Sequence, residues 1–267
     1  MIALLAAALV ALAPADEPPQ PPTPEQLAAI AARGRDLAAY DQAAGRASDA
    51  VQARNPPPGR VDGHFARKTA KGWTVAFGRL DDSQGQYLVA YEATQGAKPD
   101  QFAVAAFDPP KPDVGFYRAA ARASALALKD FAANPPAEQR PYNVAVLPAD
   151  RGQLWVYLVP APTKPGVWPL GGDVRYLVAA DGTKVESRRQ LHKTIIENKP
   201  PEGKDQQQAA GIHNHVLAMI PEDTDVFHVL TRKPPLAELI VTRSFVFVVE
   251  PDGTVRSMGK PEDLFRR

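Results

Sequence analysis

The sequence predicts an α+β protein, mainly antiparallel sheet with two or three packed helices. In two long segments, residues spaced three and four apart form the single stripe expected for one face of a helix. Most of the remaining chain alternates apolar and polar residues with the period of two that is typical of a strand. Short turns separate the alternating segments, so we expect hairpins and meanders in which neighbouring strands pair.

Residues 1–15 are expected to be a secretory signal peptide. The twelve uncharged residues 2–13 are too few for the roughly 20 that cross a bilayer, but they suit the apolar region of a signal. The small residues Ala13-Pro14-Ala15 offer a cleavage site before Asp16. We therefore expect a mature chain without a transmembrane anchor, in the periplasm or outside the cell.

The composition argues against several classes of function. Lys plus Arg (31) nearly balances Asp plus Glu (30), so the chain lacks the global field that attracts a nucleic-acid backbone. The absence of cysteine excludes an acylated lipoprotein anchor, disulfides, thiolate metal ligands and cysteine nucleophiles. Neither a Gly-x-Ser-x-Gly elbow nor a phosphate-binding or dinucleotide-binding glycine motif is present. A partner would be an envelope ligand or protein, which the sequence does not identify, and the sequence does not indicate an oligomeric state.

Residues 16–59 are predicted to be a Pro-rich leader followed by the first helix. Thr23 stands at the N-cap, Pro24 in the first turn and Gln26 at the capping-box position. The stripe that follows is thin, because Gly34 and Asp41 interrupt its apolar residues. We expect this helix to pack on the domain or to fray, and the sequence Asn-Pro-Pro-Pro-Gly at 55–59 to end it.

Residues 60–134 are predicted to form an antiparallel meander and a second helix. Strands are expected within 63–80, 85–94 and 101–107, and the Pro-rich stretch 108–113 is expected to stop the meander. The second helix lies within 114–136, with Asp113 before it and Pro135-Pro136 after it.

Residues 135–267 are predicted to be a C-terminal α+β region. Strands are expected at 142–148, 152–161, 174–180, within the long run 183–197, and at 211–219, 237–243 and 244–250. A polar loop covers 197–208, a helix covers about 223–232, and a basic tail ends the chain. A boundary near residue 135 would divide residues 60–267 into two sub-domains, and one continuous sheet is equally compatible with the pattern.

A candidate metal site lies in residues 211–230. On a strand, His213 and His215 would point to the same face, where two neutral imidazoles can bind one Zn²⁺ ion. Asp225 or Asp223 on the following helix could supply a carboxylate as the third ligand. In the alternative interpretation these histidines are structural: they pair with carboxylates across the sheet or point to solvent.

The stretch His213-Asn214-His215, followed by a loop and an acid-rich helix start, resembles the zinc-binding core of the JAMM metallopeptidases and their RadC-like relatives. The resemblance covers about forty residues and implies two histidine ligands on a strand, an aspartate ligand on the next helix and an upstream glutamate as general base. The family has a serine eight residues after the second histidine and the aspartate three further on, whereas this chain has Asp223 and Val226 there. The upstream glutamates are Glu186 and Glu197, in polar or basic surroundings.

A second candidate is a ligand groove on the segment 184–193. As a strand, this segment would place Arg188, Gln190 and His192 on one face, where they could bind a phosphate or an acidic glycan. The alternative is an edge strand whose charges prevent pairing with another sheet.

Two functional hypotheses follow from the sequence. The first is an exported protein of the bacterial envelope that acts as a non-enzymatic binding or accessory module. The alternative is a zinc-dependent hydrolase with a partial His-x-His site at 213–215.

Overall fold

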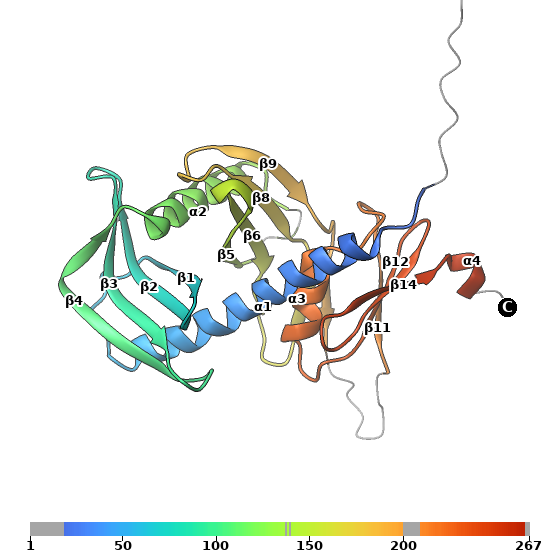
Figure 1. Cartoon of the computed structure of the whole chain (residues 1–267), viewed down its shortest axis with the longest axis horizontal. Coiled ribbons are helices and arrows are strands. Elements are labelled where there is room, and N and C mark those ends of the chain that lie inside the picture. The colour runs from blue at the N-terminus through green and yellow to red at the C-terminus, as the bar shows by residue number, and fades with distance from the viewer. Residues whose placement is uncertain (1–18, 137, 139, 200–208, 265–267) are drawn as a thin grey trace, which may run out of the picture.

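The computed structural model describes residues 19–136, 138, 140–199 and 209–264, so the expected signal peptide lies outside the described residues. It confirms an α+β fold with mostly antiparallel sheets (Figure 1). The helices are α1 (Pro24–Gln52), α2 (Phe116–Ala133), α3 (Asp223–Thr231) and α4 (Pro261–Leu264). The strands are β1 (Gly63–Thr69), β2 (Gly72–Asp81), β3 (Gln86–Gln95), β4 (Phe102–Asp113), β5 (Tyr142–Pro148), β6 (Leu154–Pro160), β7 (Trp168–Gly171), β8 (Val174–Val178), β9 (Val185–Gln190), β10 (Ile195–Asn198), β11 (Gly211–Asn214), β12 (Glu238–Val241), β13 (Val246–Val249) and β14 (Val255–Gly259).

The expected meander is the four-stranded sheet β1-β2-β3-β4. Its last strand does not stop before the prolines, as the sequence predicted, but runs through them to Asp113. Strand β4 pairs only with β3, and its register shifts opposite residues 89–91. An edge strand with an irregularity tolerates proline, because the missing N–H groups need not face a partner.

A second sheet, β5-β6-β8-β9, packs against α2, which lies between this sheet and the meander (Figure 1). The apolar cluster there joins Val89 of β3, Ala120 of α2, Val156 of β6 and Tyr176 of β8. Asp113 caps α2, because its Oδ1 accepts the backbone N–H groups of residues 115, 117 and 118 at 3.0–3.1 Å. The cluster therefore contains residues from both sides of position 135.

Helix α1 crosses the molecule and packs along its length (Figure 1). The expected capping box is present, since Thr23 and Gln26 exchange side-chain to backbone hydrogen bonds of 2.8 and 3.3 Å. The second half of α1 packs on the meander, and its first half contacts α3. Gly34 allows this contact, because a Cβ there would lie 2.6 Å from the carbonyl oxygen of Asp223 and even closer to Val226.

The C-terminal sheet has the order β11-β12-β13-β14. Strands β11 and β12 are parallel and are joined through α3, whereas the other pairs are antiparallel. The strand expected at 211–219 ends at Asn214, and the expected basic tail contains β14 and α4.

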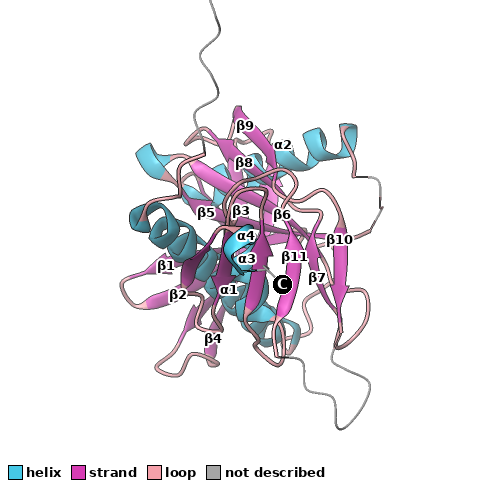
Figure 2. Ribbon diagram, turned by 90° about the vertical axis from the view of Figure 1, so that its right-hand side faces the viewer, coloured by secondary structure: helices cyan, strands magenta, loops and turns pink. Residues whose placement is uncertain are grey.

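The long run expected at 183–197 is divided. Strand β9 ends at Gln190, and β10 pairs with β7 in a separate two-stranded sheet. Figure 2 shows β7, β10 and β11 gathered on one side of the molecule. The link between β9 and β10, residues 191–194, consequently lies beside β11.

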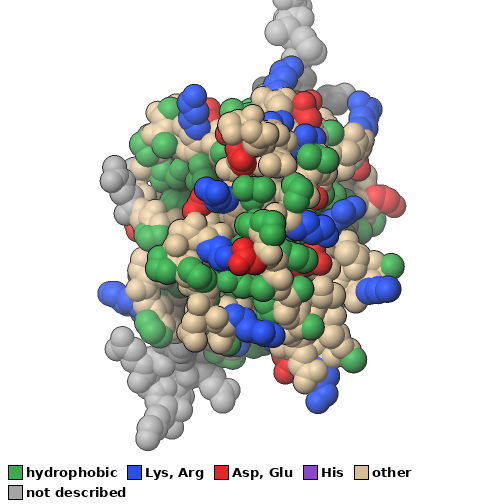
Figure 3. All heavy atoms as spheres, turned by 90° about the vertical axis from the view of Figure 1, so that its left-hand side faces the viewer, with side chains coloured by type: hydrophobic (Ala, Val, Ile, Leu, Met, Phe, Trp, Pro, Cys, Tyr) green, Lys and Arg blue, Asp and Glu red, His purple; other side chains and the backbone are tan. Residues whose placement is uncertain are grey.

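Charged side chains are distributed without one dominant sign. On the face shown in Figure 3, basic and acidic groups are interspersed among apolar ones. Among the described helices, none combines the length and the apolar character that a membrane span requires.

Candidate metal centre

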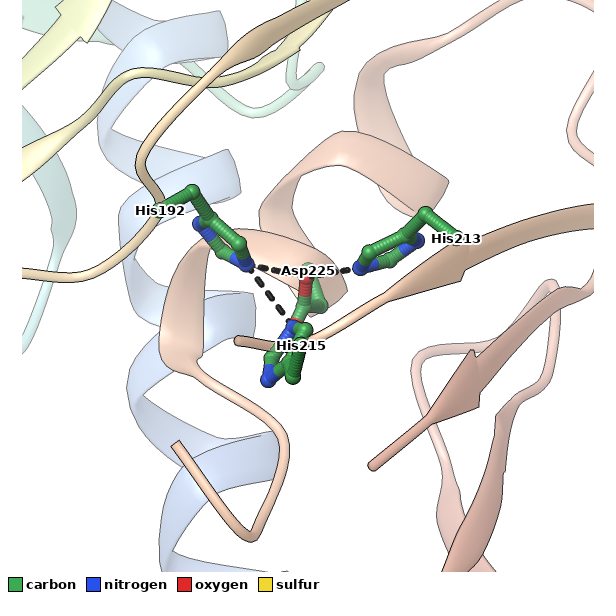
Figure 4. Close-up of side chains that lie close together, drawn as sticks. All are labelled: His192, His213, His215 and Asp225. Carbon is green, nitrogen blue, oxygen red and sulfur yellow. Dashed lines mark hydrogen bonds and ion pairs between the residues drawn. The ribbon is translucent and has the colours of Figure 1, made fainter. Parts of the chain in front are cut away.

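Four buried side chains from three segments meet in the C-terminal part of the molecule (Figure 4). His192 comes from the link between β9 and β10, His213 from β11, His215 from the residue after Asn214, and Asp225 from the first turn of α3. Their relative exposures are 8%, 5%, 7% and 0%. One potential ligand atom from each lies within 4.8 Å of all the others, so the group could hold a metal ion.

The distances suit a common ligand sphere. Nε2 of His192 and Nε2 of His213 lie 3.1 and 3.2 Å from Oδ1 of Asp225. Nε2 of His215 lies 3.2 Å from Oδ2 of Asp225 and 2.8 Å from Nε2 of His192. Four donors about 2.0–2.1 Å from a tetrahedral ion would be about 3.3 Å apart. The separations given above are close to this value, and no two of the four ligand atoms are more than 4.8 Å apart.

Two of these atoms have no hydrogen-bonding partner of good geometry among the described residues. They are Nε2 of His213 and Oδ1 of Asp225, although both are buried and 3.2 Å apart. An orphaned pair of buried polar atoms calls for an explanation such as an ion. A shared ion between them would supply that partner.

The opposite ring nitrogen of each histidine is occupied. Nδ1 of His192 lies 2.7 Å from Oδ1 of Asp173, and Nδ1 of His213 lies 3.0 Å from Oε1 of Glu238. Nδ1 of His215 lies 3.1 Å from the carbonyl oxygen of Ile220. These acceptors favour a proton on Nδ1, which leaves the Nε2 lone pair free for a metal. Metal-binding histidines in proteins almost always have such partners.

Local structure explains the direction of the two histidines on β11. The N–H of Gly211 donates to Ala237 and that of His215 to Val241, so the parallel pairing extends one residue beyond Asn214. Both imidazoles therefore point inward while the side chain of Asn214 is exposed. Gly211 is needed here, because a Cβ would lie 2.6 Å from Cδ of Glu238, which reaches past it to His213.

Asp225 is oriented by the start of α3. Its Oδ2 accepts the backbone N–H of Glu222 at 2.7 Å, in the manner of a capping box. This hydrogen bond directs Oδ1 toward His192 and His213.

The electrostatics of the group are those of a site that binds protons when it holds no cation. Burial alone would lower the pKa of His192, but the carboxylates of Asp173 and Asp225 outweigh it and hold this pKa well above its usual value. At His213, burial again lowers the pKa, but the carboxylates of Asp225 and Glu238 outweigh it and raise the pKa to about 9. Burial would raise the pKa of Asp225, but His192 and His215 hold it well below the usual range.

Asp223, the other carboxylate considered in the sequence, does not join this group. It is fully buried and accepts from Tyr157 Oη at 2.7 Å, and it pairs with Arg33 at 2.9 Å and with Arg175. These contacts join α3 to α1, β6 and β8. Asp223 therefore has a structural set of partners.

The three residues of the expected ligand groove are separated. Arg188 contacts Tyr176 and Asp130, both at 3.2 Å. Gln190 donates to the carbonyl oxygen of His192 at 2.7 Å and thereby supports the link that carries His192. His192 itself turns into the metal-ligand group, because the strand ends at Gln190 and the alternation of faces ends with it.

The two upstream glutamates and His228, the third histidine of residues 211–230, lie outside the group. Glu186 bonds to Gln153, and Glu197 pairs with Arg140 at 3.4 Å, so neither upstream glutamate reaches the histidines. His228 contacts Asn198 at 3.1 Å, and burial lowers its pKa to about 4.

Sequence reasoning missed the role of His192 as a ligand and the supporting carboxylates Asp173 and Glu238. Asp173 and Glu238 carried one local signal, an acidic group in a largely apolar stretch, whereas His192 stands in a charged run and carried none.

Two cavities border the group. One, of about 350 Å³, includes His192 and His213 in its lining, and the other, of about 460 Å³, includes His215. The side chain of Asp225 is 0% exposed and lines neither of them. The histidines, although buried, are therefore the members of the group that lie nearest the cavities.

Comparison of the chain with protein-family models, curated proteins and solved structures finds no match.

Proposed function

We propose that this chain is a zinc-binding protein in which His192, His213, His215 and Asp225 hold one ion. The observation that carries the proposal is the convergence of three imidazole Nε2 atoms and one carboxylate, all buried, with each Nδ1 already bonded. Imidazole and carboxylate donors gathered within 4.8 Å of one another suit Zn²⁺. Two buried atoms without a hydrogen-bonding partner among the described residues, Nε2 of His213 and Oδ1 of Asp225, add support.

The number of ligands favours a binding module over an enzyme. Four protein donors fill a tetrahedral sphere, which is typical of structural zinc sites, whereas catalytic sites keep a position open for water. The ion would join the β9–β10 link, β11 and α3. We propose that zinc stabilises this part of an exported envelope protein, periplasmic or secreted.

Metal analysis tests this proposal. The chain from Asp16, without a histidine tag, would be dialysed in buffer free of chelator and its metal content measured by mass spectrometry. We expect about one equivalent of zinc in the parent protein and none in His213→Ala/His215→Ala. His64→Ala removes a histidine that lies on β1, outside the group, and should keep the zinc. An equal zinc content in all three proteins, or none in the parent, would refute the proposal.

Export needs its own measurement, because it rests on residues 1–15. Expression of the full chain in a bacterial host, followed by N-terminal sequencing of the accumulated protein, should give a chain that begins at Asp16. A cytoplasmic product that begins at Met1 would contradict export.

A metal-dependent hydrolase is the second candidate, and the cavity that borders His192 and His213 favours it. In that case the ion would gain a fifth ligand from the cavity and polarise it. The zinc-loaded protein should then hydrolyse activated esters or peptides, and His192→Ala should abolish the activity. If zinc is bound and neither substrate class is cleaved, the binding module stands alone.

A further inference from the structure

The cavity of about 350 Å³ borders only one side of the candidate metal centre. His192 and His213 take part in its lining, whereas Asp225 does not. The side chains of His192 and His213 are 8% and 2% exposed, so the side of the ion between them is the one that would lie nearest this space. A four-coordinate zinc ion can accept a fifth donor, and an open edge is where such a donor enters.

The walls of the cavity are mainly apolar. Leu170, Leu191, Ile196, Val216 and Leu217 contribute to them. Of these, Ile196, Val216 and Leu217 are 42%, 72% and 49% exposed, which is unusual for large aliphatic side chains gathered at one place. A ligand with an apolar body would remove this surface from water.

The charged groups at the cavity have one sign. Lys193 lines it, no acidic side chain does so among the described residues, and Thr194 and Asn214 supply neutral hydrogen-bonding groups. Zinc would add positive charge between His192 and His213. Apolar walls with a few convergent polar groups are typical of a small-molecule site, and here the convergent charge selects an anion.

We propose that this cavity binds a carboxylic acid with an aliphatic chain, its carboxylate on the metal ion and its chain along Val216 and Leu217. The inference rests on the proposed metal site and names the ligand class of that site. Carboxylate oxygen is a normal zinc donor, so the acid needs no group other than its charge and its chain.

Cobalt-substituted protein provides the test. Visible absorption of Co²⁺ is stronger in tetrahedral than in five-coordinate sites, so a carboxylate that joins the metal lowers the absorbance. The probes are sodium acetate, butyrate and hexanoate, with hexylamine as the cationic control of equal chain length. We expect each acid to lower the absorbance, and affinity to rise about threefold to fourfold for each added methylene. Hexylamine should leave the spectrum unchanged.

Two surface variants identify the cavity. Val216→Ser/Leu217→Ser changes exposed side chains and should keep the acetate response but abolish the gain with chain length. Met219→Ser is the matched control, since Met219 is 39% exposed and lines only the neighbouring cavity. Its response should equal that of the parent protein.

The outcomes separate the two proposals. If about one equivalent of cobalt is bound and none of the acids changes the spectrum, the carboxylate inference is overturned and the metal site stands. If all acids act equally, or if Met219→Ser and the double variant behave alike, the aliphatic ligand class is overturned. If no cobalt is bound, both the inference and the proposed function fail.

Discussion

Asp173→Asn tests whether a buried carboxylate supports metal binding through His192. Asp173 is 1% exposed, its Oδ1 lies 2.7 Å from Nδ1 of His192, and its Oδ2 has no hydrogen-bonding partner among the described residues. Asparagine keeps the shape and can keep one acceptor oxygen, but it removes the negative charge that increases the basicity of the ring.

Loss of such a partner typically weakens metal binding about 10–100-fold. Because asparagine retains an acceptor, we expect the lower end, about tenfold, which corresponds to about 1.4 kcal/mol. With excess zinc, stabilisation follows the logarithm of the ratio of zinc concentration to Kd. For a chain of this size, the zinc-induced rise in Tm should therefore be about 3–6 °C smaller in the variant.

The assay combines competition with a chromophoric chelator, which gives Kd, and thermal unfolding with and without zinc. Taking the difference between the two melting temperatures removes any effect of the substitution on the metal-free fold. Asp49→Asn makes the same chemical change at an exposed position on α1 and should behave as the parent protein. An unchanged Kd and an unchanged zinc-induced rise in Asp173→Asn would refute the supporting role of Asp173.

Two further substitutions separate structural contacts from metal ligands. Gly34→Ala should destabilise the protein by about 1–3 kcal/mol in urea unfolding, because the added Cβ would collide with Val226. The control Gly45→Ala should not destabilise it, because a Cβ there has open space. Equal losses of stability in the two variants would contradict the close packing of α1 on α3. Asp223→Asn should lower the free energy of unfolding by about 3–5 kcal/mol, because it leaves Arg175 without its buried charged partner. The folded variant should still bind one zinc ion. A variant with parental stability that had lost its zinc would instead show that Asp223 is a ligand.

The helix starts could be predicted from the sequence because they depend on residues that are close together in the chain. Thr23 and Gln26 cap each other, and Asp113 caps the helix that begins three residues later. The fold class was predicted for the same reason, since periodicity is a local property. By contrast, the course of β4 through the prolines depends on its position at a sheet edge, which the local pattern does not reveal.

The candidate site could be predicted only in part. Strand alternation brings His213 and His215 together, but it cannot choose between Asp223 and Asp225. Residues two positions apart on a helix point in directions about 200° apart around its axis. The carboxylate of Asp225 therefore faces the histidines, whereas that of Asp223 faces Arg33 and Arg175. The choice is made by the packing of α3 between α1 and the sheets.

His192 illustrates a second limit. The charged run 184–193 alternates regularly and gives no sign that the strand ends at Gln190. The turn that follows is held from outside the run, by Leu191 donating to the carbonyl oxygen of Asp173 at 3.0 Å. A residue 19 positions before His192 thus helps to decide where His192 points, and the sequence pattern contains no equivalent information.

The charges around the centre lead to a last prediction, on the protons that zinc displaces. Asp173, Asp225 and Glu238 are buried carboxylates, and Arg232, 2.9 Å from Glu238, offsets one of them. Two negative charges then remain to be balanced, because a net charge is costly to bury.

In the metal-free protein, protons on His192 and His213 can balance these two charges, since the first pKa is well above its usual value and the second is about 9. A raised histidine pKa adds stability to the folded state below the unfolded pKa of about 6.5, and that contribution is lost as pH rises through the folded pKa. Zinc carries the same two charges and requires neutral rings. Calorimetric titration at pH 7 in buffers of different ionisation enthalpy should therefore show about two protons released for each zinc ion, and affinity should increase as pH rises toward 9. Release of no protons at pH 7 would mean that the carboxylates are balanced in another way, and it would remove the electrostatic reason for a divalent ion at this site.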